Sequence, residues 1–132
     1  KNSIPNKGKP DGYKPDGAVL EFTKGYGDKF ALETDPFMAA SGADILITDT
    51  WTSMGEEAEK EERKKIFKDY QINRQLLAAA NAGAMVQHCL PAYRGQEITE
   101  EVFEEHADEI FNEAENRLHA QKAVMVKLMK KD

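Results

Sequence analysis

The sequence lacks the features of several common protein classes. It has one cysteine in 132 residues, so no internal disulfide can form, and a single thiol suits a reducing cytoplasm. No apolar run approaches the roughly 20 residues that a membrane-spanning helix needs, and the start shows no signal-peptide pattern. The 18 basic residues are outnumbered by 24 acidic ones, for a net charge of −6. Without a basic stripe, we expect no nucleic-acid or membrane partner.

Familiar catalytic signatures are missing as well. There is no G-x-G-x-x-G, no phosphate-binding P-loop and no G-x-S-x-G, so ordinary nucleotide-binding and hydrolase interpretations have no support. The single cysteine and the three histidines lack the close paired spacing of zinc motifs, and we expect no metal site.

The residues that are present predict an α/β domain. Residues 1–17 are rich in proline, glycine and lysine, which predicts a flexible segment rather than a packed element. Strands are expected at 30–32, 43–48, 84–88 and 109–111, and the apolar 43–48 segment is typical of a strand buried on both faces. Helices are expected at 18–26, after Asp35, at 56–70 and 73–81, at 101–105 with Thr99 at the start, and at 113–130. This alternation is typical of a parallel sheet flanked by helices.

Ligands of such sheets bind beyond the carboxyl ends of the strands, where two loops are expected here. The first loop, DTWTSMG at 49–55, opens with Asp49, which can hold a cationic amine or can simply cap backbone amides. Ser53 and Glu56 fit a helix capping box, and the free N–H groups of that helix start also suit a substrate carboxylate. One segment could therefore receive both charged groups of an α-amino acid.

The second loop, CLPAYRG at 89–95, contains the cysteine. Neighbouring strand residues point to opposite faces, so we expect His88 and Cys89 not to form a base–nucleophile pair. Cys89 is either a small buried residue or a site residue, and Pro91 raises the prospect of an unusual backbone geometry such as a cis peptide. On the last helix, Arg117 either pairs with Glu113 at i,i+4 or offers a planar fork to a phosphate or carboxylate.

Taken together, these motifs resemble the ornithine carbamoyltransferases. DTWTSMG at 49–55, HCLP at 88–91 and EAENR at 113–117 occur in the order and spacing of that family, and GYKPD at 12–16 and RGQE at 94–97 support the match. The resemblance covers roughly residues 12–130. The Ser-Met-Gly triplet favours ornithine over putrescine, which has no carboxylate to hold, and the HCLP motif separates the chain from aspartate carbamoyltransferases.

The resemblance implies a reaction and roles for individual residues. The family transfers the carbamoyl group of carbamoyl phosphate to the δ-amine of L-ornithine, giving citrulline and phosphate, without a metal or organic cofactor. By resemblance, Asp49, Ser53, Met54 and Cys89 bind ornithine. Asp49 and Cys89 are the catalytic residues, with Cys89 as the proposed proton acceptor. Carbamoyl phosphate is bound by Cys89, Leu90 and Arg117.

The resemblance also implies parts that this sequence does not contain. The family's Ser-x-Arg-Thr and His-Pro-x-Gln segments belong to a carbamoyl-phosphate domain, and neither motif occurs here. We therefore expect residues 18–132 to be an incomplete ornithine-binding domain, a partial doubly wound, Rossmann-like parallel sheet without its first strands. The parent would be a cytoplasmic homotrimer or larger, and this chain alone would be inactive. The alternatives are a non-catalytic amino-acid-binding module and a putrescine-type enzyme.

Overall fold

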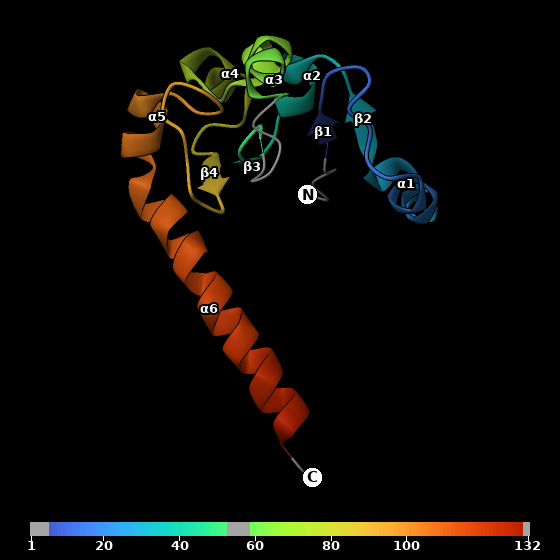
Figure 1. Cartoon of the computed structure of the whole chain (residues 1–132), viewed down its shortest axis with the longest axis vertical. Coiled ribbons are helices and arrows are strands. Elements are labelled where there is room, and N and C mark those ends of the chain that lie inside the picture. The colour runs from blue at the N-terminus through green and yellow to red at the C-terminus, as the bar shows by residue number, and fades with distance from the viewer. Residues whose placement is uncertain (1–5, 53–58, 131–132) are drawn as a thin grey trace.

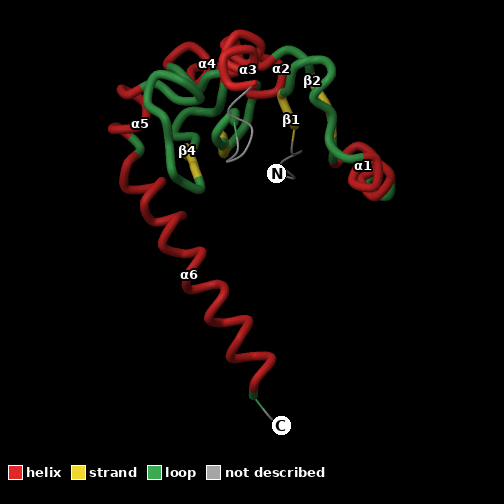
Figure 2. The backbone as a smooth tube through the Cα atoms, in the orientation of Figure 1, coloured by secondary structure: helices red, strands yellow, loops and turns green. Residues whose placement is uncertain are grey.

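The computed structural model describes residues 6–52 and 59–130. In chain order the elements are β1 (Asn6–Gly8), α1 (Gly17–Lys24), β2 (Ala31–Glu33), α2 (Pro36–Ala40), β3 (Ile45–Thr48), α3 (Lys60–Phe67), α4 (Arg74–Ala79), β4 (Met85–His88), α5 (Glu100–Glu105) and α6 (Ala107–Met129). Short 3-10 helices lie at Gly27–Lys29 and Lys68–Tyr70. The predicted α/β class, with parallel strands flanked by helices, is confirmed (Figures 1 and 2).

The strands form two parallel pairs. Strand β1 pairs with β2, and β3 pairs with β4. Within the described residues these pairs are separate rather than one continuous sheet. In the second pair Ile45 lies opposite Met85 and Thr48 lies opposite His88. Both strands of this pair therefore end at the same level, and the loops that follow them leave the sheet side by side.

Part of the N-terminal segment is ordered into the body. Asn6–Gly8 forms β1, and the Lys9 amide donates to the Glu33 carbonyl oxygen at 3.0 Å. Lys9 is only 4% exposed. The expectation of a loop over these residues was wrong, because the segment has no apolar alternation and is held mainly by backbone pairing with β2.

Capping side chains mark the starts of two helices, as expected. The Asp35 carboxylate accepts from the Phe37 amide at 2.8 Å, and Pro36 occupies the first turn of α2. The Thr99 hydroxyl accepts from the Val102 amide at the start of α5. These caps satisfy amides that a helix cannot pair internally, so they fix where each helix begins.

The core lies between the β3–β4 pair and the helices α2, α4, α5 and α6. Its buried members are mostly aliphatic: Ala40, Leu46, Ile72, Leu76, Val86, Ile98, Val102, Phe103 and Ile110. Strand β3 departs from the prediction of burial on both faces. Leu46 is 9% exposed, whereas Ile47 on the other face is 68% exposed. No element of the described chain covers that second face fully, so the apolar residues there remain accessible.

The last helix is longer than predicted. The expected strand at 109–111 is wrong, because these residues lie in the first turns of α6. Ile110 is fully buried against the core, and a Glu109 carboxylate oxygen accepts from the Val86 amide at 2.8 Å. A short apolar run cannot by itself distinguish a strand from a buried helical turn. No helix of the described residues is both long and apolar enough to cross a bilayer.

Candidate functional site

The register of β3 and β4 brings two of the predicted site residues together. Thr48 lies opposite His88, so the next residues, Asp49 and Cys89, emerge side by side at the carboxyl ends of the strands. The Cys89 thiol donates to Asp49 Oδ1 over 3.3 Å, and the Thr50 amide donates to the same oxygen at 2.7 Å. Asp49 thus makes the local backbone contact expected of a loop aspartate and also faces the thiol.

A buried histidine holds the second loop. His88 and Glu97 are both 0% exposed, and His88 Nε2 lies 3.1 Å from Glu97 Oε1. The Leu90 amide donates to His88 Nδ1 at 2.9 Å. Since Nδ1 accepts, the proton of the imidazole is on Nε2, which donates to Glu97. Glu97 Oε1 also accepts from the Tyr93 amide. The pair therefore ties both ends of the loop to the core.

The backbone of this loop is unusual at Leu90 and Pro91. Leu90 has a φ of 55°, in the left-handed region that non-glycine residues rarely adopt, and the Leu90–Pro91 peptide is cis as anticipated. A leucine in this conformation costs about 1–3 kcal/mol, and it persists only where its surroundings fix it. The bond from its amide to His88 is one such constraint. Strained backbone of this kind gathers at binding sites.

The surroundings of Cys89 favour its protonated form. Burial raises the pKa of the thiol, and the hydrogen bond and negative charge of Asp49 raise it further, with a smaller effect from Glu113. The free site therefore holds a thiol beside a carboxylate rather than a thiolate. An incoming cationic amine would offset the Asp49 charge and lower the pKa of Cys89 again.

His88 lies closer to this pair than strand alternation suggested. One ligand atom from each of Asp49, His88 and Cys89 lies within 4.8 Å of the others. The two ring nitrogens of His88 bond to Glu97 and Leu90 and not to the thiol, in agreement with the expectation that imidazole and thiol form no base–nucleophile pair. Both ring nitrogens of His88 already have partners, so a metal ion would have to displace a bond to Glu97 or Leu90. The absence of a metal site remains a prediction.

Three further site residues were predicted: Ser53, Met54 and Arg117. Ser53 and Met54 lie outside the described residues. Arg117 is exposed on α6, and it forms no ion pair with Glu113 among the described residues. Glu113 instead influences Cys89 electrostatically, and its Oε2 atom is buried without a partner. Arg117 is one helical turn beyond Glu113 on the same side of α6.

Two residues near the site were not predicted from the sequence. Glu97 was seen only as part of a supporting motif, and Glu113 only as a possible helix-surface partner of Arg117. A buried glutamate cannot be recognised in a loop sequence, because nothing local shows that its partner is a histidine nine positions earlier. Glu113 stands in the helix-opening pattern E-x-x-x-R, which was noticed but assigned to the wrong interaction.

The fold and the site together define a class of protein. Parallel strands that end in a carboxylate, a thiol and a strained loop form a polar site of the kind that holds a small amine at a sheet edge. The family model "Aspartate/ornithine carbamoyltransferase, Asp/Orn binding domain" matches residues 6–128. The chain belongs to this family, in its amino-acid-binding domain.

The matching relatives described here are all ornithine carbamoyltransferases. The ornithine carbamoyltransferase of Nitratiruptor sp. is 53% identical over 126 residues, covering 92% of this chain and 41% of the relative. The solved anabolic ornithine carbamoyltransferase of Campylobacter jejuni is 45% identical with a TM-score of 0.87, covering 93% of this chain and 42% of that one. The enzyme of Pyrococcus furiosus has a TM-score of 0.79 at 43% identity. This chain spans about two fifths of their length.

Proposed function

We propose that this chain supplies the ornithine-binding half of an ornithine carbamoyltransferase. The observation that carries the proposal is the contact between Cys89 Sγ and Asp49 Oδ1, 3.3 Å apart at the ends of two parallel strands. A carboxylate there attracts the cationic δ-amine of ornithine, and the thiol lies within reach of the proton that the amine must lose. The relatives that carry this name support the substrate.

The chemistry follows from the charges of the site. An ammonium group displaces the thiol as the partner of Asp49, and its positive charge favours loss of the Cys89 proton to solvent. The resulting thiolate accepts a proton from the ammonium, which becomes a nucleophilic amine. The amine attacks the carbamoyl carbon, the carbon–oxygen bond to phosphate breaks, and the second proton of the nitrogen passes to the departing phosphate, giving citrulline and phosphate. We assign Arg117 to the phosphate and Leu90 to the carbamoyl group, with Ser53 and Met54 at the amino-acid end of ornithine.

Glu113 fits the same scheme. Its unpartnered Oε2 and its effect on Cys89 place negative charge beside the thiol. A second carboxylate increases the attraction for a cationic amine and repels anions from this side of the site. The phosphate is then expected on the side of Arg117. The parent enzyme is expected to be a cytoplasmic homotrimer or larger, as the family resemblance implies.

The proposal is tested with two proteins: the chain alone, and the chain joined to the N-terminal part of a relative. Calorimetry of the 132-residue chain with L-ornithine, L-norvaline and putrescine measures binding by this half. Citrulline synthesis is measured after joining the chain to the N-terminal three fifths of the Campylobacter jejuni relative. We expect turnover with ornithine but not putrescine, a large loss in Cys89→Ala and Asp49→Ala, and no turnover from the chain alone.

The outcomes separate the candidate functions. Ornithine binding by the chain with no turnover in the joined protein would favour a non-catalytic amino-acid-binding module. Faster turnover with putrescine than with ornithine would show a putrescine-type enzyme. Unchanged turnover in both alanine variants would contradict the proposed roles of Asp49 and Cys89.

A further inference from the structure

Helix α3 contacts the first site loop, the segment that follows β3 and opens with Asp49. The Arg63 guanidinium donates through Nη1 to the Trp51 carbonyl oxygen at 3.3 Å. The Phe67 ring stacks on the Trp51 indole, with ring centroids 6.1 Å apart and ring planes 28° apart. Phe67 also packs edge-on against Tyr13, with a centroid distance of 4.8 Å. Because Trp51 is two residues after Asp49, these contacts hold the loop that carries the carboxylate.

The first turn of α3 also contacts the second site loop, the segment that follows β4 and opens with Cys89. Lys60 Nζ lies over the Tyr93 ring, 5.5 Å from its centroid. This is within the roughly 6 Å at which a cation is attracted to the face of an aromatic ring. The Tyr93 amide donates to Glu97 Oε1 at 2.6 Å, whereas the side chain is 46% exposed. The core therefore holds the backbone of Tyr93, and Lys60 holds its ring.

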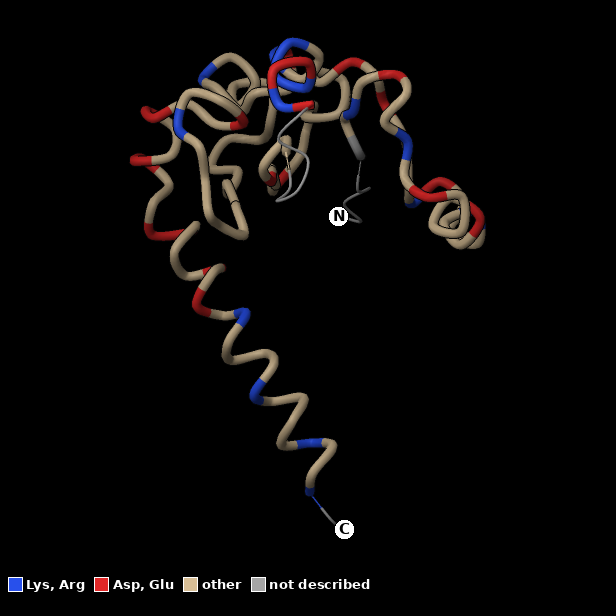
Figure 3. Tube along the Cα trace, viewed as in Figure 1, with Lys and Arg blue, Asp and Glu red and all other residues tan. Residues whose placement is uncertain are grey.

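The cations of α3 have different kinds of partner. Residues of both charges alternate around this helix, as Figure 3 shows. Arg63 pairs with Glu59 at 3.0 Å and Lys64 pairs with Glu61 at 2.9 Å, so these two ion pairs join neighbouring turns. Lys60 instead contacts a ring of another segment. An ion pair between neighbouring turns stabilises the helix locally, whereas a contact with another segment fixes where that segment lies.

From these contacts we infer that Lys60 is a positioning residue, which sets the distance between the two site loops by holding Tyr93 against α3. Asp49 and Cys89 open the two loops, and Cys89 Sγ lies 3.3 Å from Asp49 Oδ1. A shift of either loop changes this distance, and a binding site works only while its groups stay close to their productive geometry. The inference deepens the proposed function and rests on it, because a loosened second loop should bind ornithine less tightly.

A role of Lys60 through charge alone is the alternative that the test separates. Under that alternative the Tyr93 ring has no part, so Tyr93→Leu, which changes no charge, would have no effect. Lys60 is not among the groups that shift the pKa of Cys89. A change of thiol reactivity in a Lys60 variant therefore reports a change in the position of the loop.

The first experiment measures the second loop without any ligand. The chain has one cysteine, so the rate of iodoacetamide alkylation of the folded 132-residue chain reports on Cys89 alone. Lys60→Met and Tyr93→Leu should each raise this rate about threefold, the effect expected of one partly exposed cation–π contact. The double variant should react no faster than either single variant, because both remove the same contact. Lys60→Arg and Tyr93→Phe keep a cation and a ring, and they should react like the unmodified chain.

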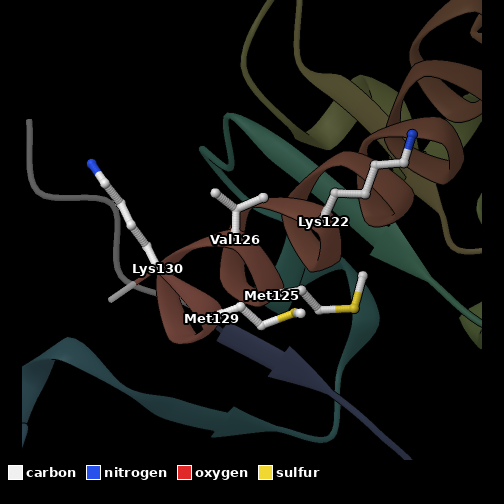
Figure 4. A pocket seen from close by; sticks show the side chains of 5 residues that line it. All are labelled: Lys122, Met125, Val126, Met129 and Lys130. Carbon is white, nitrogen blue, oxygen red and sulfur yellow. The ribbon is translucent and has the colours of Figure 1, made fainter. Parts of the chain in front are cut away.

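Two matched controls remove the same charge at a distance from Tyr93. Lys65→Met lies on an exposed side of α3, and Lys122→Met lies on the exposed part of α6, where Figure 4 shows the Lys122 side chain. Both should leave the alkylation rate unchanged. Urea denaturation of every variant ensures that the rates are compared between folded chains.

The second experiment measures the consequence for the amino acid. In calorimetry with L-ornithine, Lys60→Met and Tyr93→Leu should each weaken binding about threefold, and the two conservative variants should not. A chain that binds no ornithine would count against the proposed function, and the alkylation rates would still decide the inference.

Three results of the alkylation experiment would overturn the inference. The first is an unchanged rate in both Lys60→Met and Tyr93→Leu. The second is a change in Lys60→Met with none in Tyr93→Leu, which would show that the lysine acts without the ring. The third is a double variant in which the two effects multiply, because independent effects would show that the two side chains do not act on each other.

Discussion

Asp49 and Cys89 acquire their combined chemistry from position rather than from residue type. An aspartate after a strand and a lone cysteine are each ordinary, and they are 40 positions apart in the chain. The parallel register places them together, and the site then raises the pKa of the thiol. The sequence predicted both residues through the family resemblance. It could not predict the direction of the pKa shift, because that depends on burial and on the distance to Asp49.

The first prediction concerns this pair. Asp49→Asn removes a negative charge and leaves the thiol a neutral acceptor in place of an anionic one, so the pKa of Cys89 should fall toward its ordinary value. More thiolate is then present at mildly alkaline pH, and alkylation by iodoacetamide should become several-fold faster. The measurement is the alkylation rate of the folded chain as a function of pH.

The control variant is Asp28→Asn, whose carboxylate is not among the groups that shift Cys89. Its alkylation profile should match that of the unmodified chain. A slower reaction in Asp49→Asn, or a higher apparent pKa, would show that the carboxylate does not act on the thiol in the way the structure indicates.

At the scale of elements, the sequence predicted helix starts best, because a helix cap is a signal within a few neighbouring residues. The caps at Asp35 and Thr99 were recognisable because a polar side chain before a helix satisfies backbone amides within the same turn. The interval 109–111 was misassigned because its role depends on β4, more than twenty residues earlier. Glu109 Oε2 accepts from the Val86 amide and lies 3.0 Å from His106 Nδ1, contacts that a sequence pattern cannot display.

The second prediction tests this junction between β4 and α6. Glu109→Ala leaves the Val86 amide without its partner, and we expect a loss of about 1–2 kcal/mol in the free energy of unfolding. Urea denaturation measures the loss, and hydrogen exchange should show faster exchange at Val86. Glu115→Ala on the exposed part of the same helix is the matched control, with little effect on unfolding of the chain. Equal losses in the two variants would contradict the proposed role of the Glu109 contact.

At the scale of the whole molecule, the sequence predicted the class and family but not the arrangement of the sheet. The ordered set of motifs was enough to identify the relatives, since the residues of each motif are set by chemistry. The separation into two strand pairs was not predictable, because pairing depends on partners distant in the chain. The exposure of Ile47 was missed for the same reason: an apolar strand does not reveal which of its faces is covered.

At the N-terminus, strand β1 packs closely against helix α2. An added Cβ atom at Gly8 in β1 would lie 3.0 Å from the Ala39 side chain of α2, closer than ordinary van der Waals contact, so glycine favours this close approach. Gly8→Val should force β1 away from α2 and destabilise the chain by about 1–3 kcal/mol, the usual cost of overpacking. Gly17→Ala is the control, because nothing lies within 4 Å of an added Cβ atom there. Urea denaturation of both variants measures the difference, and a Gly8→Val chain as stable as the control would show that β1 does not contribute to the folded body.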